Sequence, residues 1–330
     1  MTLVLSPRDV RDLLPMPGCI DLMATALETL ARGDAVQPLR QGIRLPDNLG
    51  LLGMMPGYLG RPRALGLKAV AVFPGNHGTG YDAHQGIVLL FELEHGTPIA
   101  ILDASEITAI RTAAATGVAT RLLARDDVRV LALVGTGVQG RTHLEAMLAV
   151  RPFEEVRVFS RTANHRQTFA ERETARHGIP VHAVDSVKDA VQDADVICTT
   201  TSAREPVLAG AWIAPGTHVN AVGSSIRSTR ELDTEAVARS RLFVDRKEST
   251  VNEAGDFLFP LAEGAITEEH IVAEIGDLLV GAHPGRTRPD EITLFKSLGL
   301  AVEDLAAAQY VYDAARQAGR GVEVDLGGRT

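Results

Sequence analysis

The chain has 330 residues and a formal net charge of -9, with 33 Lys and Arg residues against 42 Asp and Glu residues. A protein that binds duplex nucleic acid needs a surplus of Lys and Arg to displace counterions from the phosphates, so we expect no nucleic-acid partner. The length is too great for one ordinary hydrophobic core and predicts two domains.

The cysteines and the N-terminus bear on where the protein works. Cys19 and Cys198 cannot form a disulfide framework, which indicates a reducing cytoplasm. Charged residues, among them Arg8 and Asp9, interrupt the N-terminal segment, so we expect no signal peptide. No apolar run approaches the roughly 20 residues that span a bilayer, and we therefore expect a cytoplasmic protein without a membrane partner.

Predicted helix and strand mix in the N-terminal part of the chain. Residues 21–31 have the pattern of an amphipathic helix, while residues 64–73 and 86–94 are rich in Val, Leu and Phe and predict strands. Residues 74–80 between these strands contain Pro and Gly and predict a loop.

Residues 103–125 predict the helix that leads from the first domain into the second. Asp103 and Glu106 resemble a capping box at its start. Apolar residues then recur at helical spacing, namely Ile107, Ile110, Ala114, Val118 and Leu122.

From Val128 onward, short strands and helices alternate regularly. The predicted strands are residues 130–134, 156–159, 181–184, 196–200, 218–222 and 242–244, and the predicted helices include residues 139–149 and 163–177. Such alternation with short loops predicts a parallel sheet covered by helices on both faces. Residues 292–316 predict helix again, and this segment can pack back onto the N-terminal domain and make that domain discontinuous.

A glycine motif follows the first of these strands. Gly135, Gly137 and Gly140 form a G-x-G-x-x-G pattern, with Val138 and Gln139 inside it, between a predicted strand and a predicted helix. The first Gly allows a tight turn, the second lets the backbone approach a pyrophosphate, and the third lets the helix pack on the strand. Free N–H groups at the helix start then bind the anion. The alternative, a Gly-rich turn without a ligand, is disfavoured by the surrounding strand–helix–strand unit.

The residues after the next strand bear on the choice of cofactor. NAD enzymes usually place Asp or Glu there to hold the ribose 2′-OH, but this chain has Ser160, Arg161 and Thr162. An Arg and two hydroxyls can donate hydrogen bonds to a 2′-phosphate, which favours NADPH. NADH bound through backbone alone, beside an exposed Arg, is the other interpretation.

Two further segments end predicted parallel strands. Residues 199–201 are three consecutive Thr, and residues 220–223 read Asn-Ala-Val-Gly. Ligands of open α/β sheets bind outside these carboxyl ends, so Thr200 and Val222 are candidates to contact the ribose or nicotinamide. The alternative is that the Thr hydroxyls only cap the following helices.

Motifs in the same order along nearly the whole chain resemble the ornithine cyclodeaminase/mu-crystallin family. They are Glu106-Ile107-Thr108 with Arg111-Thr112-Ala113-Ala114, the Gly135 loop, His218 to Gly223, Arg230-Glu231-Leu232-Asp233, and Phe295-Lys296-Ser297-Leu298-Gly299. The likeness is greater to the mu-crystallin, or ketimine reductase, branch.

This resemblance implies a fold and an assembly. The fold class is α/β: a Rossmann doubly wound parallel sheet plus a discontinuous α+β domain that binds substrate and dimerises. We expect the substrate domain at residues 1–117, completed by residues 298–330, and the Rossmann domain at residues 118–297. The implied assembly is a homodimer, and the implied ligands are NAD(P) and an α-amino or α-imino acid.

The resemblance also implies roles for individual residues. Arg44, Lys68 and Arg111 match residues that hold the substrate's α-carboxylate, and they would meet in a cleft opposite the glycine loop. His84 and Gln85 match a stretch near the cofactor. Thr112 is expected beside the cofactor as well, and Ser297 near the nicotinamide. Taken alone, Arg44 reads as a surface charge, Lys68 as a strand residue facing solvent, and Arg111 as a partner of Glu106 or Asp103.

One position departs from the family pattern. Cyclodeaminases carry an Asp shortly after the Asn-Ala-Val-Gly segment, and Ser225 stands there in this chain. A Ser is no general base at neutral pH without a partner, so we place Ser225 among the substrate-binding residues and doubt cyclodeaminase activity.

The favoured function is therefore NADPH-dependent reduction of an α-imino acid, or ketimine, to an L-amino acid. Lys68 and Arg111 are the candidate catalytic residues, with Lys68 able to protonate the imine nitrogen. The alternatives are an alanine dehydrogenase-type enzyme, an ornithine cyclodeaminase and a non-catalytic binder of small carboxylated ligands. No His, Cys or Asp cluster has metal-ligand spacing, so we expect no metal.

Overall fold

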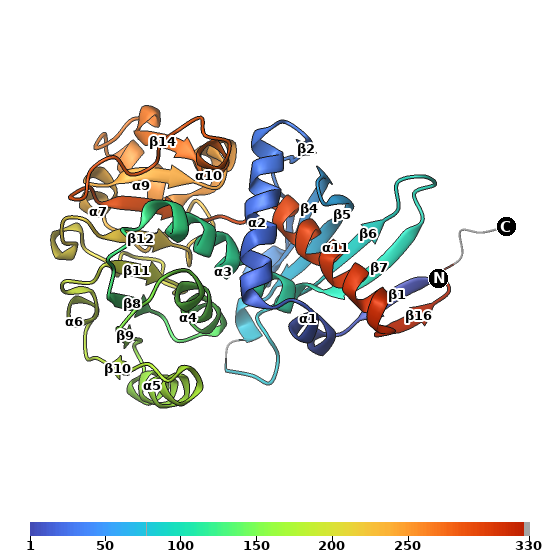
Figure 1. The fold of residues 1–330 in the computed structure, drawn as a ribbon, viewed down its shortest axis with the longest axis horizontal. Helices are drawn as coiled ribbons and strands as arrows, with labels where there is room; N and C mark the ends of the chain where they lie inside the picture. The colour runs from blue at the N-terminus through green and yellow to red at the C-terminus, as the bar shows by residue number, and fades with distance from the viewer. Residues whose placement is uncertain (77, 327–330) are drawn as a thin grey trace. The chain divides into compact units, whose positions relative to one another are not determined.

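The computed structural model describes residues 1–76 and 78–326, which fall into two units (Figure 1). The first unit joins residues 1–112 to the C-terminal segment from residue 300, and the second comprises residues 113–299. The boundaries expected from the sequence, at residues 117 and 298, lie close to these. Residues 327–330 of the expected C-terminal segment are outside the described residues.

The first unit contains an eight-stranded mixed sheet in the order β16-β1-β7-β6-β5-β4-β2, with β3 paired to β4. Its strands are β1 (Thr2–Leu5), β2 (Ala35–Val36), β3 (Gln41–Arg44), β4 (Leu51–Gly60), β5 (Arg63–Val72), β6 (His84–Phe91), β7 (Pro98–Asp103) and β16 (Val322–Val324). The predicted strands at 64–73 and 86–94 are confirmed as β5 and β6, with slightly shifted ends. β4 escaped prediction because Pro56 and three glycines interrupt its apolar pattern.

Helices cover one face of this sheet. They are α1 (Pro7–Leu13), α2 (Met16–Ala31) and α11 (Ala301–Ala318), and the short helices η1 (Pro46–Asn48) and η2 (Pro74–Asn76) lie in connections. Gly57 and Gly66 face α11, because a Cβ on either would lie within 3.4 Å of the Leu305 side chain. Lys68 shares their face, since side chains alternate along a strand. Helix α2 begins before the predicted Asp21.

The other face of the same sheet is apolar and only partly buried. Leu67 on β5 pairs with Leu89 on β6, which pairs with Ile101 on β7, so these three side chains form a row across the sheet. None of the three is fully buried, and Ile87 beside them is 40% exposed. An apolar row of this kind needs a partner surface.

Helix α3 (Ala104–Leu123) spans the boundary between the units. The Asp103 carboxylate accepts a hydrogen bond of 2.8 Å from the Glu106 backbone N–H, which is one half of the predicted capping box. The Glu106 side chain pairs with Arg11. Most of the helix is buried, which suits its many Ala and Thr residues.

The second unit is built on an eight-stranded sheet in the order β10-β9-β8-β11-β12-β15-β13-β14, and every recorded pairing is parallel. The strands are β8 (Val130–Val134), β9 (Glu155–Phe159), β10 (Val181–Ala183), β11 (Val196–Thr199), β12 (His218–Ala221), β13 (Arg241–Val244), β14 (Ile271–Glu274) and β15 (Thr293–Lys296). The first six strands in this order have the arrangement of a Rossmann fold, with the reversal of strand order at β8 and β11. The predicted α/β fold class is confirmed.

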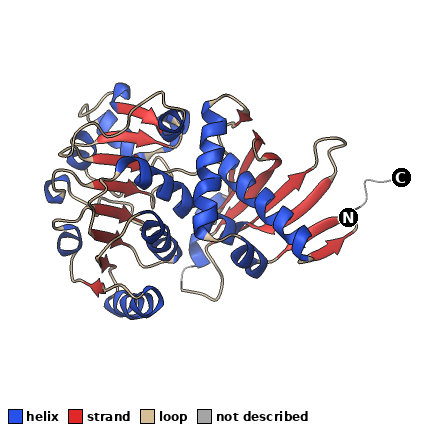
Figure 2. Cartoon of the chain, in the orientation of Figure 1, coloured by secondary structure: helices blue, strands red, loops and turns tan. Residues whose placement is uncertain are grey.

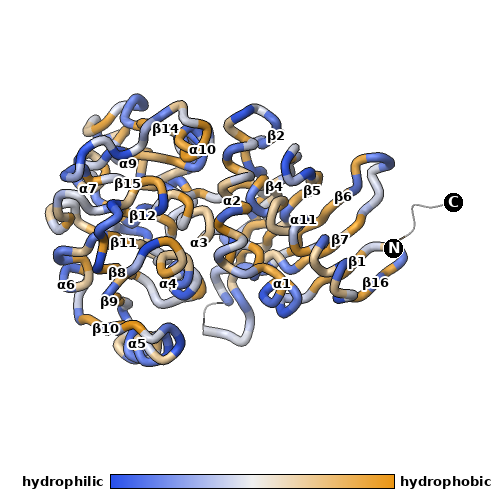
Figure 3. Tube along the Cα trace, viewed as in Figure 1, coloured by the Kyte–Doolittle hydropathy of each residue, from blue (hydrophilic) through white to orange (hydrophobic). Residues whose placement is uncertain are grey.

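Helices lie on both faces of the parallel sheet (Figure 2). They are α4 (Val138–Val150), α5 (Ala163–His177), α6 (Val187–Val191), α7 (Thr234–Ala238), α8 (Lys247–Glu253), α9 (Gly255–Ala262) and α10 (Ile275–Leu279), with the short helices η3 (Gly210–Trp212) and η4 (Glu268–His270). α5 has the predicted bounds, and Figure 3 shows that much of it consists of hydrophilic residues.

The prediction of helix over residues 292–316 was wrong in its first part. Residues 293–296 form β15, which pairs with β12 on one side and β13 on the other. A strand that is buried on both faces gives an unbroken apolar run, which periodicity cannot distinguish from helix. Gly299 has a φ of +79°, and α11 begins only after it, at Ala301. Within the described residues, no helix is long and apolar enough to cross a membrane.

Candidate active site

Four charged side chains form a buried cluster in the first unit. Lys68 of β5 places Nζ 2.7 Å from Asp304 Oδ2, and Arg111 of α3 places Nε 2.7 Å from Asp304 Oδ1. Arg111 Nη1 also lies 2.5 Å from Glu303 Oε2. Lys68 donates a further hydrogen bond of 3.3 Å to the Thr108 hydroxyl. Three elements distant in sequence, namely β5, α3 and the first turn of α11, therefore meet at one point.

Burial decides the chemistry of this cluster. Lys68 and Arg111 are each 3% exposed, Glu303 1% and Asp304 0%. Burial lowers the pKa of Lys68 to about 8, although the Asp304 carboxylate opposes this shift. Burial also acts to lower the pKa of Arg111, but the two carboxylates more than offset it and raise that pKa. Lys68 thus holds its proton at neutral pH, yet releases it more easily than an exposed lysine.

The structure changes the interpretation of the predicted carboxylate-binding residues. Lys68 and Arg111 lie together, and Arg111 pairs with Glu303 and Asp304 rather than with Glu106 or Asp103, the partners considered from the sequence. Arg44 is exposed on β3, and no described contact brings it to this cluster.

Sequence reasoning missed three participants. Arg40, half-buried just before β3, is close enough for its charge to help lower the pKa of Lys68. Glu303 and Asp304 were not singled out, because acidic residues in the first turn of a helix usually serve only its dipole. The cluster joins residues that are far apart in the sequence, so no local pattern indicates it.

In the second unit, each glycine of the predicted motif has its expected surroundings. Gly135 has a φ of +121°, and a Cβ there would lie 2.6 Å from Thr200 Oγ1. A Cβ on Gly140 would lie 2.2 Å from the Gly135 carbonyl oxygen. At Gly137 no described heavy atom lies within 4 Å of such a Cβ, so the backbone there borders open space. These surroundings of the three glycines are typical of a loop that can bind the pyrophosphate of a dinucleotide.

The start of α4 completes this loop. Gly137 is the N-cap, and no side chain caps the helix. Val138, the first helical residue, is 60% exposed, and Gln139 is half-buried. Uncapped N–H groups at an open helix start favour a bound phosphate.

Other predicted cofactor residues follow neighbouring strands at the same edge of this sheet. The Thr200 N–H donates to the Val134 carbonyl over 2.8 Å, the Val222 N–H to the Thr199 carbonyl over 3.0 Å, and the Ser297 N–H to the Ala221 carbonyl over 3.1 Å. Ser225 is half-buried in the loop after β12. The structure thus brings Thr200, Val222 and Ser297 to the carboxyl edge, where Thr200 touches the glycine loop.

The predicted 2′-phosphate segment follows β9. Arg161 is exposed, and Ser160 is half-buried, with its hydroxyl donating to the Thr162 carbonyl over 3.3 Å. A residue that the sequence did not suggest, Arg166, donates to the Ser160 carbonyl over 3.3 Å and pairs with Asp185. Of these two Arg side chains, Arg161 is the exposed one.

Two predicted cofactor residues belong to the first unit. His84 is exposed at the start of β6, and its carbonyl accepts a hydrogen bond of 3.2 Å from the Ser105 hydroxyl. Thr112 is 7% exposed on α3. Their roles toward a cofactor stay predictions.

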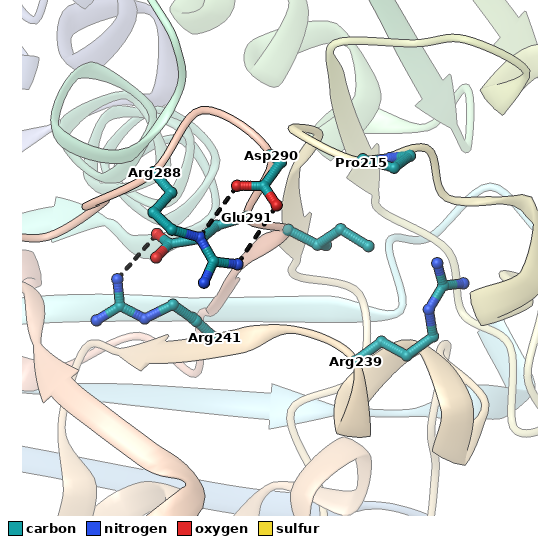
Figure 4. A pocket seen from close by; sticks show the side chains of 7 residues that line it. Pro215, Arg239, Arg241, Arg288, Asp290 and Glu291 are labelled. Atoms are coloured by element: carbon teal, nitrogen blue, oxygen red, sulfur yellow. Dashed lines mark hydrogen bonds and ion pairs between the residues drawn. The ribbon is translucent and has the colours of Figure 1, made fainter.

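A cavity of about 400 Å³ lies at the opposite edge of the parallel sheet (Figure 4). Pro215 and Ile292, which precede β12 and β15, line it together with three Arg side chains and two carboxylates. Arg241 pairs with Glu291 at 2.9 Å and Arg288 with Asp290 at 3.1 Å. The third Arg side chain, Arg239, pairs with Glu235 outside the lining. The cavity lies away from the carboxyl ends of the strands, where cofactors bind. Within residues 1–76 and 78–326, no three His, Cys, Asp or Glu side chains could hold a metal ion.

Known proteins share this architecture. Ketimine reductase mu-crystallin of Mus musculus is 41% identical over 281 residues, which cover 85% of this chain and 86% of the relative. The structure of Thermococcus litoralis Delta(1)-pyrroline-2-carboxylate reductase in complex with NADH and L-proline superposes with a TM-score of 0.95, at 40% identity, over 98% of this chain and all of the other. An archaeal alanine dehydrogenase dimer with bound NAD has a TM-score of 0.93, at 31% identity, over 98% and 99% of the two chains. The model of the ornithine cyclodeaminase/mu-crystallin family matches residues 1–319, and the chain belongs to that family.

Proposed function

We propose that the protein reduces the C=N bond of an α-imino acid to give an L-amino acid, with a reduced nicotinamide dinucleotide as hydride donor. The observation that carries this proposal is the buried Lys68–Asp304–Arg111 cluster, in a chain that also holds an open dinucleotide loop. The name of the mouse relative supports a ketimine as the substrate, and the name of the Thermococcus relative supports a cyclic one, such as Δ1-pyrroline-2-carboxylate.

The reaction needs three contributions. The bound dinucleotide supplies a hydride to the imine carbon. Lys68 and Arg111 bind the substrate carboxylate and so fix the orientation of the imine. The nitrogen takes up a proton, either before binding or from Lys68 Nζ, and the pKa of Lys68 near 8 suits that transfer. The C=N bond thereby becomes CH–NH, and both hydrogens are accounted for.

Arg40 is the third cation that we assign to the carboxylate site. Its charge acts on Lys68, whereas Arg44 is exposed on β3. Lys68 and Arg111 are already balanced by Asp304 and Glu303, so an incoming carboxylate favours one more cation nearby.

Lys68→Met tests this assignment. Arg111 then faces both Asp304 and Glu303, so the variant should have a lower Tm, and its kinetics are measured below that temperature. Loss of a charge-assisted hydrogen bond should lower kcat/KM by about tenfold to a hundredfold, and kcat should fall as well if Lys68 supplies the proton. We expect the wild-type kcat/KM to decline as the pH rises through about 8, because Lys68 then loses its proton. Steady-state kinetics with Δ1-pyrroline-2-carboxylate give both results, and fluorescence titration checks that NADPH affinity is nearly unchanged.

Arg40→Met and Arg44→Met form a matched pair for the same assay. Arg40→Met should lower kcat/KM, and the exposed Arg44 should tolerate the change. The reverse result would return the role to Arg44, as the sequence predicts. Wild-type kcat/KM in Lys68→Met would make the cluster purely structural and remove the basis of the proposal.

A second candidate is reductive amination of a keto acid, which the similarity to an alanine dehydrogenase favours. Imine reduction needs no free ammonia, whereas a dehydrogenase of this type depends on it. Assays of pyruvate with ammonia and of the cyclic imine alone separate the two activities. L-ornithine, the substrate of a cyclodeaminase, should give little proline because Ser225 offers no carboxylate.

We further infer a preference for NADPH over NADH. Arg161 is exposed, and the segment 160–162 lacks a carboxylate that would repel a 2′-phosphate. The double variant Ser160→Asp/Arg161→Ala should reverse the ratio of the two dissociation constants. Equal affinity of the wild type for both cofactors would exclude the preference.

We also propose a homodimer formed through the apolar sheet face of the first unit. The row Leu67–Leu89–Ile101 is partly exposed in the single chain, and a second copy would bury it. Sedimentation equilibrium should give a dimer for the wild type and a monomer for Leu67→Glu/Leu89→Glu. A monomeric wild type at micromolar concentration would refute the proposal.

A further inference from the structure

Glu231 is a buried carboxylate with no part in the chemistry above. It is 0% exposed and lies between β12 and α7. Its Oε1 accepts hydrogen bonds from the Thr201 N–H and hydroxyl, each of 2.7 Å. Its Oε2 accepts from the Thr199 hydroxyl at 2.8 Å and from the Gly223 N–H at 2.6 Å. One side chain thus joins the chain that follows β11 to the loop that follows β12.

The two loops meet closely at this point. A Cβ on Gly223 would lie 2.1 Å from the Thr201 carbonyl oxygen and 2.5 Å from Glu231 Oε1. Only glycine leaves room for the carboxylate to reach both backbone N–H groups. The place where the two loops meet therefore accommodates the Glu231 carboxylate and leaves no room for a side chain at residue 223.

Two more buried charges support Glu231. Asp256 Oδ1 accepts from the Glu231 and Leu232 N–H groups at 2.8 and 3.0 Å, and Asp256 Oδ2 lies 3.0 Å from Lys296 Nζ. Lys296 also donates to the carbonyls of Ala221 and Ser224 at 3.1 and 2.5 Å. Asp256 and Lys296 are 2% and 1% exposed. An apolar core would fill this space at lower desolvation cost, so the network is better explained by the geometry it enforces.

These loops border the glycine motif. Glu231 binds Thr199, and the next residue, Thr200, packs against Gly135. A Cβ on Gly135 would lie 2.6 Å from the Thr200 hydroxyl. The loop after β12 carries Val222 and Ser225 at the same edge. The reversal of strand order at β8 and β11 is where open sheets of this kind bind dinucleotides.

We propose that Glu231 is a positioning residue of the dinucleotide site. It holds the loops after β11 and β12 in the conformation that receives the cofactor, and it acts through those loops rather than by contact. The inference rests on the proposed function only in taking a nicotinamide dinucleotide as the ligand.

Glu231→Gln tests the proposal with little change of shape. Each carboxylate oxygen accepts one backbone N–H and one hydroxyl, so an amide has no orientation that serves both N–H groups. We expect the NADPH affinity to fall by about tenfold or more, because one buried backbone N–H loses its hydrogen-bond acceptor. The KM for the imino acid should change less than the NADPH affinity, because the carboxylate cluster belongs to the first unit. Fluorescence titration without imine measures the NADPH affinity. Gly137→Ala serves as the reference for complete loss of NADPH binding, because its methyl group fills the open space of the loop.

Glu291→Gln is the matched control at the other edge of the same sheet (Figure 4). Glu291 is 9% exposed and accepts from Arg241 at 2.9 Å and from the Thr287 N–H and hydroxyl at 2.9 and 2.6 Å. This variant should lower the Tm but keep NADPH affinity within about twofold. If Glu231→Gln lowers only the Tm and retains NADPH affinity, Glu231 is structural and the inference fails.

Thr199→Val provides a milder probe if Glu231→Gln does not fold. It removes one hydroxyl from Glu231 without stranding a backbone N–H, and it should weaken NADPH binding in the same direction. Unchanged NADPH affinity in Thr199→Val would likewise overturn the inference. A wild type that binds no dinucleotide would instead refute the proposed function, so the two failures are distinguishable.

Discussion

The sharing of one buried carboxylate by two cations is the interaction on which the first unit depends. Asp304 is 0% exposed and binds Lys68 through one oxygen and Arg111 through the other. Removal of one partner from a buried pair costs about 3–5 kcal/mol, because the remaining charge is left uncompensated. Strand β5, helix α3 and helix α11 are therefore held in register by charge as well as by apolar packing.

The same charge balance bears on the substrate. Two cations and two carboxylates leave the cluster of Lys68, Arg111, Glu303 and Asp304 neutral, so a lone carboxylate would add an uncompensated charge. An α-imino acid with a protonated nitrogen brings its own positive charge, and Arg40 can supply another. Under the proposed assignment, the cluster therefore suits ligands that carry a carboxylate beside a basic nitrogen, as both substrate and product of imine reduction do.

Local patterns predicted much of the second unit and little of the charge network. The glycine motif, β8 and α5 have signals within a few residues, and the structure has them at or near the predicted positions. β15 was taken for helix because a doubly buried strand lacks alternation. The residues flanking Gly53, Pro56 and Gly57 form a long strand only because β3 and β5 pair with it on either side.

The candidate site shows the same limit. Lys68 and Arg111 were found through family resemblance, and their burial was not visible in the sequence. Asp304 owes its importance to Lys68 and Arg111, which are far away along the chain, so no local pattern marks it. Glu231 lies in a motif that carries the family resemblance, but the motif does not reveal that it binds the Thr199 and Thr201 side chains. The resemblance pointed to Arg44, and nothing in the same polar segment marked Arg40. Only the folded chain separates an exposed strand residue from one whose charge acts on Lys68.

Transfer of deuterium tests the central claim most directly. The enzyme would be incubated for a single turnover with NADPH that carries deuterium on the transferable position of the nicotinamide ring, and with Δ1-pyrroline-2-carboxylate. The account predicts L-proline with one deuterium on Cα, because the hydride goes to the carbon that bears the carboxylate. Proline without deuterium at Cα, or oxidation of the cofactor without any proline, would contradict it.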